Sequence, residues 1–206
     1  MSDSISRRAF ALAAGLALGG AAELTADEKP KEEKPKTPAG PTEAPFKRDY
    51  EAPKFKPSWR KQQINRQLVQ DFVIYAHFDL DMTKKLLEKE PGLINATMDW
   101  GGGDWETGLG GASHVGNREI VTFLLEKGAR IDIFCAAMMG QLDAVKAFLT
   151  LQPKLIDARG PHGISLHAHA KVGGKQSEKV LEHLQSIKKV ELKPLPSLKK
   201  PAGKPG

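Results

Sequence analysis

The chain has 206 residues, a formal net charge of +6 and one cysteine, Cys135, so an intramolecular disulfide is excluded. The positive charge lies at the ends: residues 188–206 carry six lysines and one glutamate, whereas residues 62–187 carry thirteen basic and fifteen acidic side chains. A body this close to neutrality argues against specific binding of nucleic acid, which needs basic residues on a folded surface.

The first residues indicate export from a bacterial cytoplasm. Arg7 and Arg8 precede Phe10 and a run of small and apolar residues, 11–22, that is too short to span a bilayer. We interpret residues 1–26 as a cleavable signal peptide that resembles the twin-arginine type, with an ordinary secretory signal as the alternative. The mature protein is expected to be periplasmic, bound to the cell envelope or secreted, with no membrane span.

A segment rich in lysine, proline and glutamate follows at residues 27–57. Its first half has too few apolar residues to offset its conformational entropy, so we expect a disordered linker. We expect the aromatic residues near its end to cap the folded domain, with a short recognition motif as the alternative. These aromatic residues are Phe46, Tyr50, Phe55 and Trp59.

Periodic apolar residues predict a helical domain over residues 58–187. Ile64, Leu68 and Phe72 lie at helical spacing and predict a first helix that begins near Ser58. Beyond this domain, residues 188–206 form a lysine- and proline-rich tail that we expect to be disordered.

The clearest helical unit spans residues 107–132 and predicts a helix–turn–helix. Gly116 and Gly128 end its two helices, because glycine enters the left-handed conformation of a helix cap at little cost. The second helix carries apolar residues at helical spacing: Ile120, Val121, Phe123, Leu124 and Leu125. So short a pair cannot bury this face alone and therefore needs neighbours of the same shape.

The unit recurs along the chain. Residues 136–140 repeat residues 112–116, a third copy occupies residues 166–173, and a weaker one occupies residues 75–79. Two helices per unit and a period of about 33 residues are typical of ankyrin repeats.

The chain resembles the ankyrin-repeat family over residues 62–186. Residues 107–109, Leu166-His167 and residues 126–132 match the family's motif. The resemblance implies an all-α, ankyrin-like solenoid of about four helix–turn–helix repeats that binds another protein.

The array departs from the family's pattern in three places. The step from Gly116 to Gly140 leaves little chain for a finger between those units, Gly108 and Gly110 replace the usual proline and histidine, and Asp79 replaces a glycine. We therefore expect a degenerate array.

The favoured function is a non-catalytic protein-binding module, monomeric and without a cofactor or metal. Its partner would dock on a concave face that includes the glycine- and tryptophan-rich loop between the first two units. An alternative is that both tryptophans of this loop fold back to seal a gap. The predicted face comprises Trp100, Asp104, Trp105, Glu106, His114, Phe134, Met138 and His169.

Two other functions stay open. A hydrolase-like enzyme would bind zinc through His162, His167 and His169, with Asp157 nearby. Against it, His167 and His169 project to different sides of a helix, and the resemblance implies a structural hydrogen bond for His167. A structural cell-envelope protein would instead use the basic tail for weak electrostatic adhesion to anionic polymers.

We expect three further residues to have structural roles. His77 and His114 each stand alone in the sequence, so we expect them to be isolated structural histidines. Cys135 lies beside two alanines on a thin helix and is expected to be a small buried hydrophobe.

Overall fold

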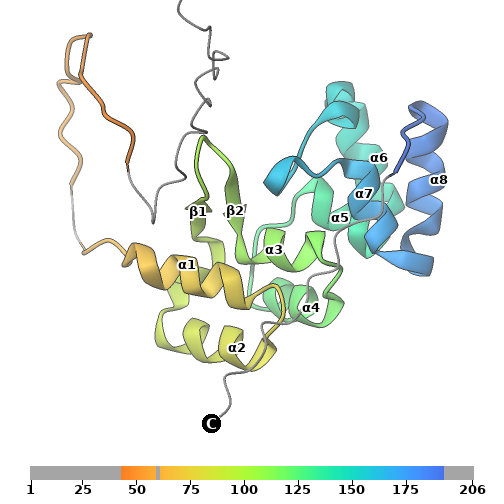
Figure 1. Cartoon of the computed structure of the whole chain (residues 1–206), viewed down its shortest axis with the longest axis horizontal. Coiled ribbons are helices and arrows are strands. Elements are labelled where there is room, and N and C mark those ends of the chain that lie inside the picture. The colour runs from red at the N-terminus through yellow and green to blue at the C-terminus, as the bar shows by residue number, and fades with distance from the viewer. Residues whose placement is uncertain (1–42, 59–60, 193–206) are drawn as a thin grey trace, which may run out of the picture. The chain divides into compact units, whose positions relative to one another are not determined.

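The computed structural model describes residues 43–58 and 61–192 and is mainly helical (Figure 1). The predicted signal peptide, Trp59 and most of the basic tail lie outside the described residues. A mainly helical protein is thus confirmed, with one two-stranded sheet that the sequence did not predict. None of the described helices has both the length and the apolar character needed to cross a bilayer.

The described α-helices form four hairpins in chain order. They are α1 (Arg66–Tyr75) with α2 (Leu80–Lys89), α3 (Gly108–His114) with α4 (Arg118–Glu126), α5 (Ile133–Met139) with α6 (Leu142–Leu151), and α7 (Leu166–Val172) with α8 (Glu178–Ile187). Contacts also join α1 to α3, α3 to α5 and α5 to α7, so the first helix of each hairpin packs on the next. Short 3₁₀ turns, η1 (Pro91–Asn95), η2 (Pro153–Asp157), η3 (Pro161–Gly163) and η4 (Gly174–Ser177), complete the connections.

The helix ends follow from local chemistry. Asn65 caps α1, which therefore begins at Arg66 and not near Ser58. Asp79 caps α2 with an extended φ of −129°, so it does not take the left-handed conformation of the glycine that it replaces. The glycines after α3 and α5 do take it, with φ of +76° at Gly116 and +79° at Gly140.

The buried side chains form two hydrophobic cores. The first core lies between α1, α2, α3 and α4 and includes Phe72, Ile120 and Leu124. The second lies between α5, α6, α7 and α8 and includes Leu166 and Leu184. Helix α5 contributes to both, so it marks the boundary between the two halves of the helical domain.

Cys135 on α5 is fully buried in the first core, as expected of a small hydrophobe. Burial disfavours the thiolate and raises the pKa of Cys135 to about 11. The thiol is therefore a packing group and not a nucleophile at neutral pH.

Arg118, at the start of α4, forms hydrogen bonds with the two hairpins that build the second core. Its guanidinium donates to the carbonyl oxygens of Met138 at 2.7 Å and Gly173 at 2.8 Å, and to Ser177 Oγ at 3.1 Å. One side chain thus satisfies acceptors on the two hairpins that follow its own.

The aromatic cap predicted for the start of the domain is wrong for the described residues. Phe46, Tyr50 and Phe55 are 72%, 57% and 81% exposed. They lie in a coil segment that precedes α1 and do not join either core.

Candidate metal centre

A β-hairpin between the first two helix hairpins sets up the site. Strands β1 (Thr97–Asp99) and β2 (Trp105–Thr107) pair in antiparallel register, with Met98 opposite Glu106. Because successive residues of a strand point to opposite faces, Glu106 turns inward and is 1% exposed, whereas Trp105 turns outward and is 60% exposed.

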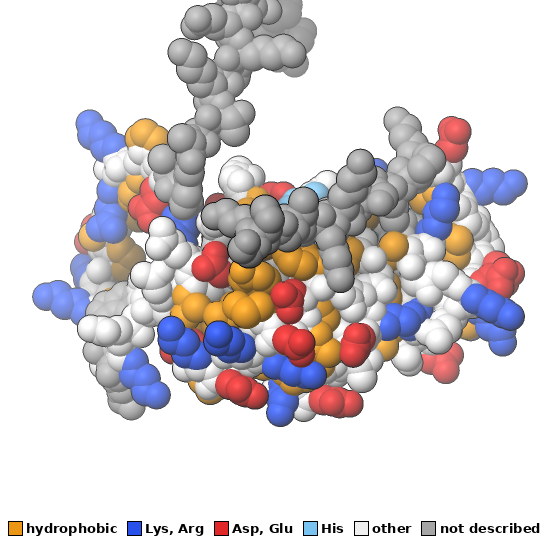
Figure 2. All heavy atoms as spheres, turned by 60° about the horizontal axis from the view of Figure 1, so that its bottom comes forward, with side chains coloured by type: hydrophobic (Ala, Val, Ile, Leu, Met, Phe, Trp, Pro, Cys, Tyr) orange, Lys and Arg blue, Asp and Glu red, His pale blue; other side chains and the backbone are white. Residues whose placement is uncertain are grey.

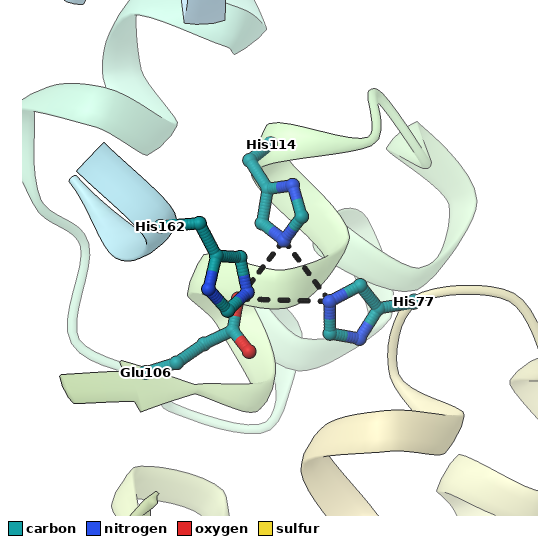
Figure 3. A group of neighbouring side chains, drawn as sticks. All are labelled: His77, Glu106, His114 and His162. Atoms are coloured by element: carbon teal, nitrogen blue, oxygen red, sulfur yellow. Dashed lines mark hydrogen bonds and ion pairs between the residues drawn. The ribbon is translucent and has the colours of Figure 1, made fainter. Parts of the chain in front are cut away.

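Four side chains from separate segments converge beside this hairpin: His77, Glu106, His114 and His162. His77 lies in the turn after α1, His114 is the last residue of α3, and His162 belongs to η3. One ligand atom of each residue lies within 4.8 Å of the other three. Figure 3 shows the three rings and the carboxylate directed toward one another.

The separations of these atoms fit a tetrahedral metal ion. His114 Nε2 lies 3.0 Å from His77 Nε2 and 2.9 Å from Glu106 Oε1. The same Oε1 lies 3.6 Å from His77 Nε2 and 3.5 Å from His162 Nε2. Zinc bound by imidazole and carboxylate at about 2.0–2.2 Å requires neighbouring ligand atoms about 3.4 Å apart. These four of the six separations bracket that value, and all six are within 4.8 Å.

Hydrogen bonds behind the site orient three of the four groups. His77 Nδ1 donates to the carbonyl oxygen of Val73 at 2.8 Å, and His162 Nδ1 donates to Asp104 Oδ2 at 2.8 Å. Since a carbonyl or a carboxylate can only accept, both Nδ1 atoms carry a proton, so in the neutral rings both Nε2 atoms offer a lone pair. Such second contacts are typical of histidines that bind metals.

The carboxylate is oriented in the same way. Trp100 Nε1 donates to Glu106 Oε2 at 2.7 Å, which leaves Oε1 facing the three rings. Glu106 Oε1 is buried and has no hydrogen bond of acceptable geometry, although His114 Nε2 lies close to it. A buried carboxylate oxygen without a well-aligned donor is the kind of atom that a cation stabilises.

The charge of Glu106 increases this need for a cation. Burial alone would raise its pKa, but the close His114 and His77 imidazoles outweigh burial and hold the pKa at about 2. Burial likewise lowers the pKa of His77, and contact with the Glu106 carboxylate reverses this and raises it. Among the described residues, only imidazoles lie within ion-pair distance of Glu106.

His162 reaches the site in a strained backbone conformation. Among the described residues it is the only non-glycine residue with a positive φ, +57°. This left-handed conformation costs about 1–2 kcal/mol for a residue with a Cβ. Asp104 offsets the cost, because its Oδ1 accepts the backbone N–H of His162 at 2.8 Å while its Oδ2 accepts the ring.

The residues predicted to face a protein partner differ in how exposed they are in the structure. Glu106, His114, Met138 and His169 are buried, so they offer no surface to a partner, and Asp104 and Phe134 are only partly exposed. The two tryptophans behave differently from each other. Trp100 is partly buried and packs against the first core, as in the alternative in which it folds back, whereas Trp105 is exposed.

The predicted grouping of His162, His167 and His169 around one metal does not form. His167 Nε2 donates to the carbonyl oxygen of Lys188 at 2.8 Å, which is a structural hydrogen bond of the expected kind. His169 Nδ1 donates to the carbonyl oxygen of Ser165 at 2.9 Å. His162 instead joins His77 and His114, which were expected to be isolated but contact each other.

His169 should make the fold sensitive to acid. Burial, together with the nearby His114, lowers its pKa from 6.5 to about 4. The neutral ring is therefore favoured in the folded state, and its contribution to stability is complete above pH 6.5 and is lost as pH falls toward 4. A shift of this size corresponds to about 3 kcal/mol.

A His169→Asn variant keeps a side-chain donor for the Ser165 carbonyl but has no titrating group. We expect the wild type to lose about 3 kcal/mol more stability than this variant between pH 7 and pH 4. Urea unfolding of both proteins across this range, in the presence of a chelator, measures the difference. If the free energies of unfolding of the two proteins changed equally with pH, the lowered pKa of His169 would be contradicted.

No protein-family model, curated protein or solved structure matches this chain. The candidate site therefore stands on its own geometry.

Proposed function

We propose that this chain is an exported, ankyrin-like repeat protein that binds one divalent transition-metal ion through His77, Glu106, His114 and His162. The observation that carries the proposal is the convergence of three imidazole Nε2 atoms and one carboxylate oxygen at separations that suit a tetrahedral ion. Three nitrogen ligands and one oxygen ligand suit zinc, and copper(II) competes for such ligand sets.

The ligand count favours a structural or regulatory metal over a hydrolytic one. Catalytic zinc sites use three protein ligands and keep a fourth position for water. Here four protein side chains converge, so a tetrahedral ion would be fully coordinated. We therefore propose a non-catalytic protein, in place of a hydrolase built on the histidines near residue 165.

The proposal is tested by titrating chelator-treated protein with zinc in a calorimeter. We expect one ion per chain and, with free zinc at about 100 times Kd, a stabilisation of about 2.7 kcal/mol. Thermal unfolding should then move upward by roughly 5–10 °C. His183 lies on α8, outside the cluster, so a His183→Ala variant should bind zinc like the wild type and controls for adventitious binding by histidine.

A second candidate function is protein binding, which Trp105 favours. Its side chain is 60% exposed at the end of a projecting hairpin, a typical position for an aromatic anchor. Figure 2, which brings α2 and α4 forward, shows hydrophobic side chains among charges of both signs on that face. Capture of an envelope protein that is lost on Trp105→Ala would support this function, and unchanged capture would remove Trp105 from it.

A further inference from the structure

The four metal ligands belong to opposite sides of the boundary between the two cores. His77, Glu106 and His114 lie on segments that surround the first core. His162 lies between α6 and α7, whose buried residues belong to the second core. An ion held by all four side chains would therefore connect the two halves of the helical domain.

The two sides differ in how firmly they hold their ligands. His77, Glu106 and His114 have side chains that are 12%, 0% and 8% exposed, so three ligands form a buried half-site. The side chain of His162 is 39% exposed, and that of its partner Asp104 is 30% exposed. Hydrogen bonds between partly exposed groups compete with water and hold a segment weakly.

The segment that carries His162 is a small loop, residues 159–165, that is closed by its own backbone hydrogen bonds. Arg159 and Ser165 form an isolated β-bridge at its base, and Gly160 N–H donates to the carbonyl oxygen of Ile164 at 2.9 Å. The polar contacts of His162 itself reach the β-hairpin of the first half, through Asp104 and Glu106. A ligand bond at His162 would fix the loop far more firmly than these contacts do.

We infer that the metal ion acts as a latch: it binds the buried half-site of His77, Glu106 and His114 and then fixes residues 159–165 through His162, which Asp104 positions. The inference rests on the proposed metal site and adds what the ion regulates. Metal occupancy controls whether the loop between α6 and α7 is locked onto the first half of the helical domain. Asp104 is a positioning residue, because it holds both the backbone N–H and the ring of His162.

Hydrogen exchange of the full-length protein tests the latch, with saturating zinc compared with chelator. The amides of Gly160, His162, Gly163 and Ile164 all donate hydrogen bonds within the loop or to Asp104, so their exchange reports its opening. We expect zinc to slow exchange in residues 159–165 at least tenfold in the wild type. His183→Asn should show the same protection.

The His162→Asn variant separates the latch from the metal site. Asparagine tolerates the left-handed backbone and removes the imidazole. At zinc concentrations that saturate the three remaining ligands, we expect protection around His77 and His114 but none in residues 159–165. Equal protection of the loop in this variant, or no protection of it in the wild type despite bound zinc, would overturn the latch and leave the metal site intact. Absence of zinc binding in the wild type would overturn both.

The role of Asp104 has its own readout. Cobalt(II) reports its coordination in the visible spectrum, so the spectrum follows whether His162 is bound. Asp104→Asn should lower metal affinity 10–100-fold, as loss of a second contact behind a ligand does, and should move the cobalt spectrum toward that of His162→Asn. Lower affinity with an unchanged spectrum would assign Asp104 a merely electrostatic role and contradict positioning.

Discussion

The Glu106→Gln variant is expected to lose at least a hundredfold in affinity for zinc, about 2.7 kcal/mol. Glutamine keeps the size of the side chain and can still accept the hydrogen bond that Trp100 donates at 2.7 Å. It removes the buried negative charge, and with Trp100 bonded to its oxygen it turns a nitrogen donor toward the three Nε2 atoms. The metal then loses an anionic ligand and meets hydrogen atoms in its place.

Calorimetric titration of the chelator-treated variant measures this loss. Glu119 is an exposed glutamate on α4, near the site in sequence but outside the cluster, so Glu119→Gln is the matched control and should bind zinc as the wild type does. If Glu106→Gln kept wild-type affinity, the ion would sit elsewhere and the cluster would be only a hydrogen-bond network.

The helical hairpins could be predicted because their signals are local. Gly116 and Gly128 both take the left-handed conformation that their positions at helix ends indicated. The start of the domain was misplaced, because Ile64 and Leu68 pack on the core while the helix itself begins only after the Asn65 cap. Apolar spacing alone does not show where a cap will interrupt it.

The cluster of three histidines and Glu106 could not be found by local spacing, because its members are spread from residue 77 to residue 162. One signal was nevertheless present. His77 lies two residues before Asp79 as His114 lies two residues before Gly116, so the predicted alignment of the units gives both histidines the same position. Helices α1 and α3 pack on each other, and the two rings meet, with centroids 4.9 Å apart. Their pairing follows from the packing of α1 on α3, whereas the positions of Glu106 and His162 depend on two loops.

The two loops that carry Glu106 and His162 explain why the sequence did not indicate the positions of these residues. The sequence showed tryptophans, glycines and carboxylates between the first units, but only the strand register turns Glu106 inward and Trp105 outward. The backbone of His162 is left-handed because Asp104, far away in sequence, holds it there. A long-range contact of this kind leaves no periodic trace.

Gly140→Ala is expected to destabilise the fold by at least about 4 kcal/mol, among the largest effects of a single substitution. Gly140 ends α5 with φ of +79°, and a Cβ placed there would lie 2.1 Å from the carbonyl oxygen of Gln176 and 2.9 Å from its carbon. These are backbone atoms at the turn between α7 and α8, so no side-chain rotation relieves the clash. Either α5 or η4 has to move, and the contacts of Arg118 with Met138 and Gly173 move with them.

Gly128→Ala is the matched control, because it isolates the close approach from the cost of the backbone conformation. Gly128 has φ of +90°, yet a Cβ there meets nothing within 4 Å. Alanine at this position should cost only the strain of a left-handed residue, about 1–2 kcal/mol. Urea denaturation followed by circular dichroism compares the two variants. Equal losses of stability in the two variants would mean that the left-handed conformation alone explains why glycine occupies position 140. A much larger loss at Gly140 would show that its missing side chain lets the last two hairpins pack together.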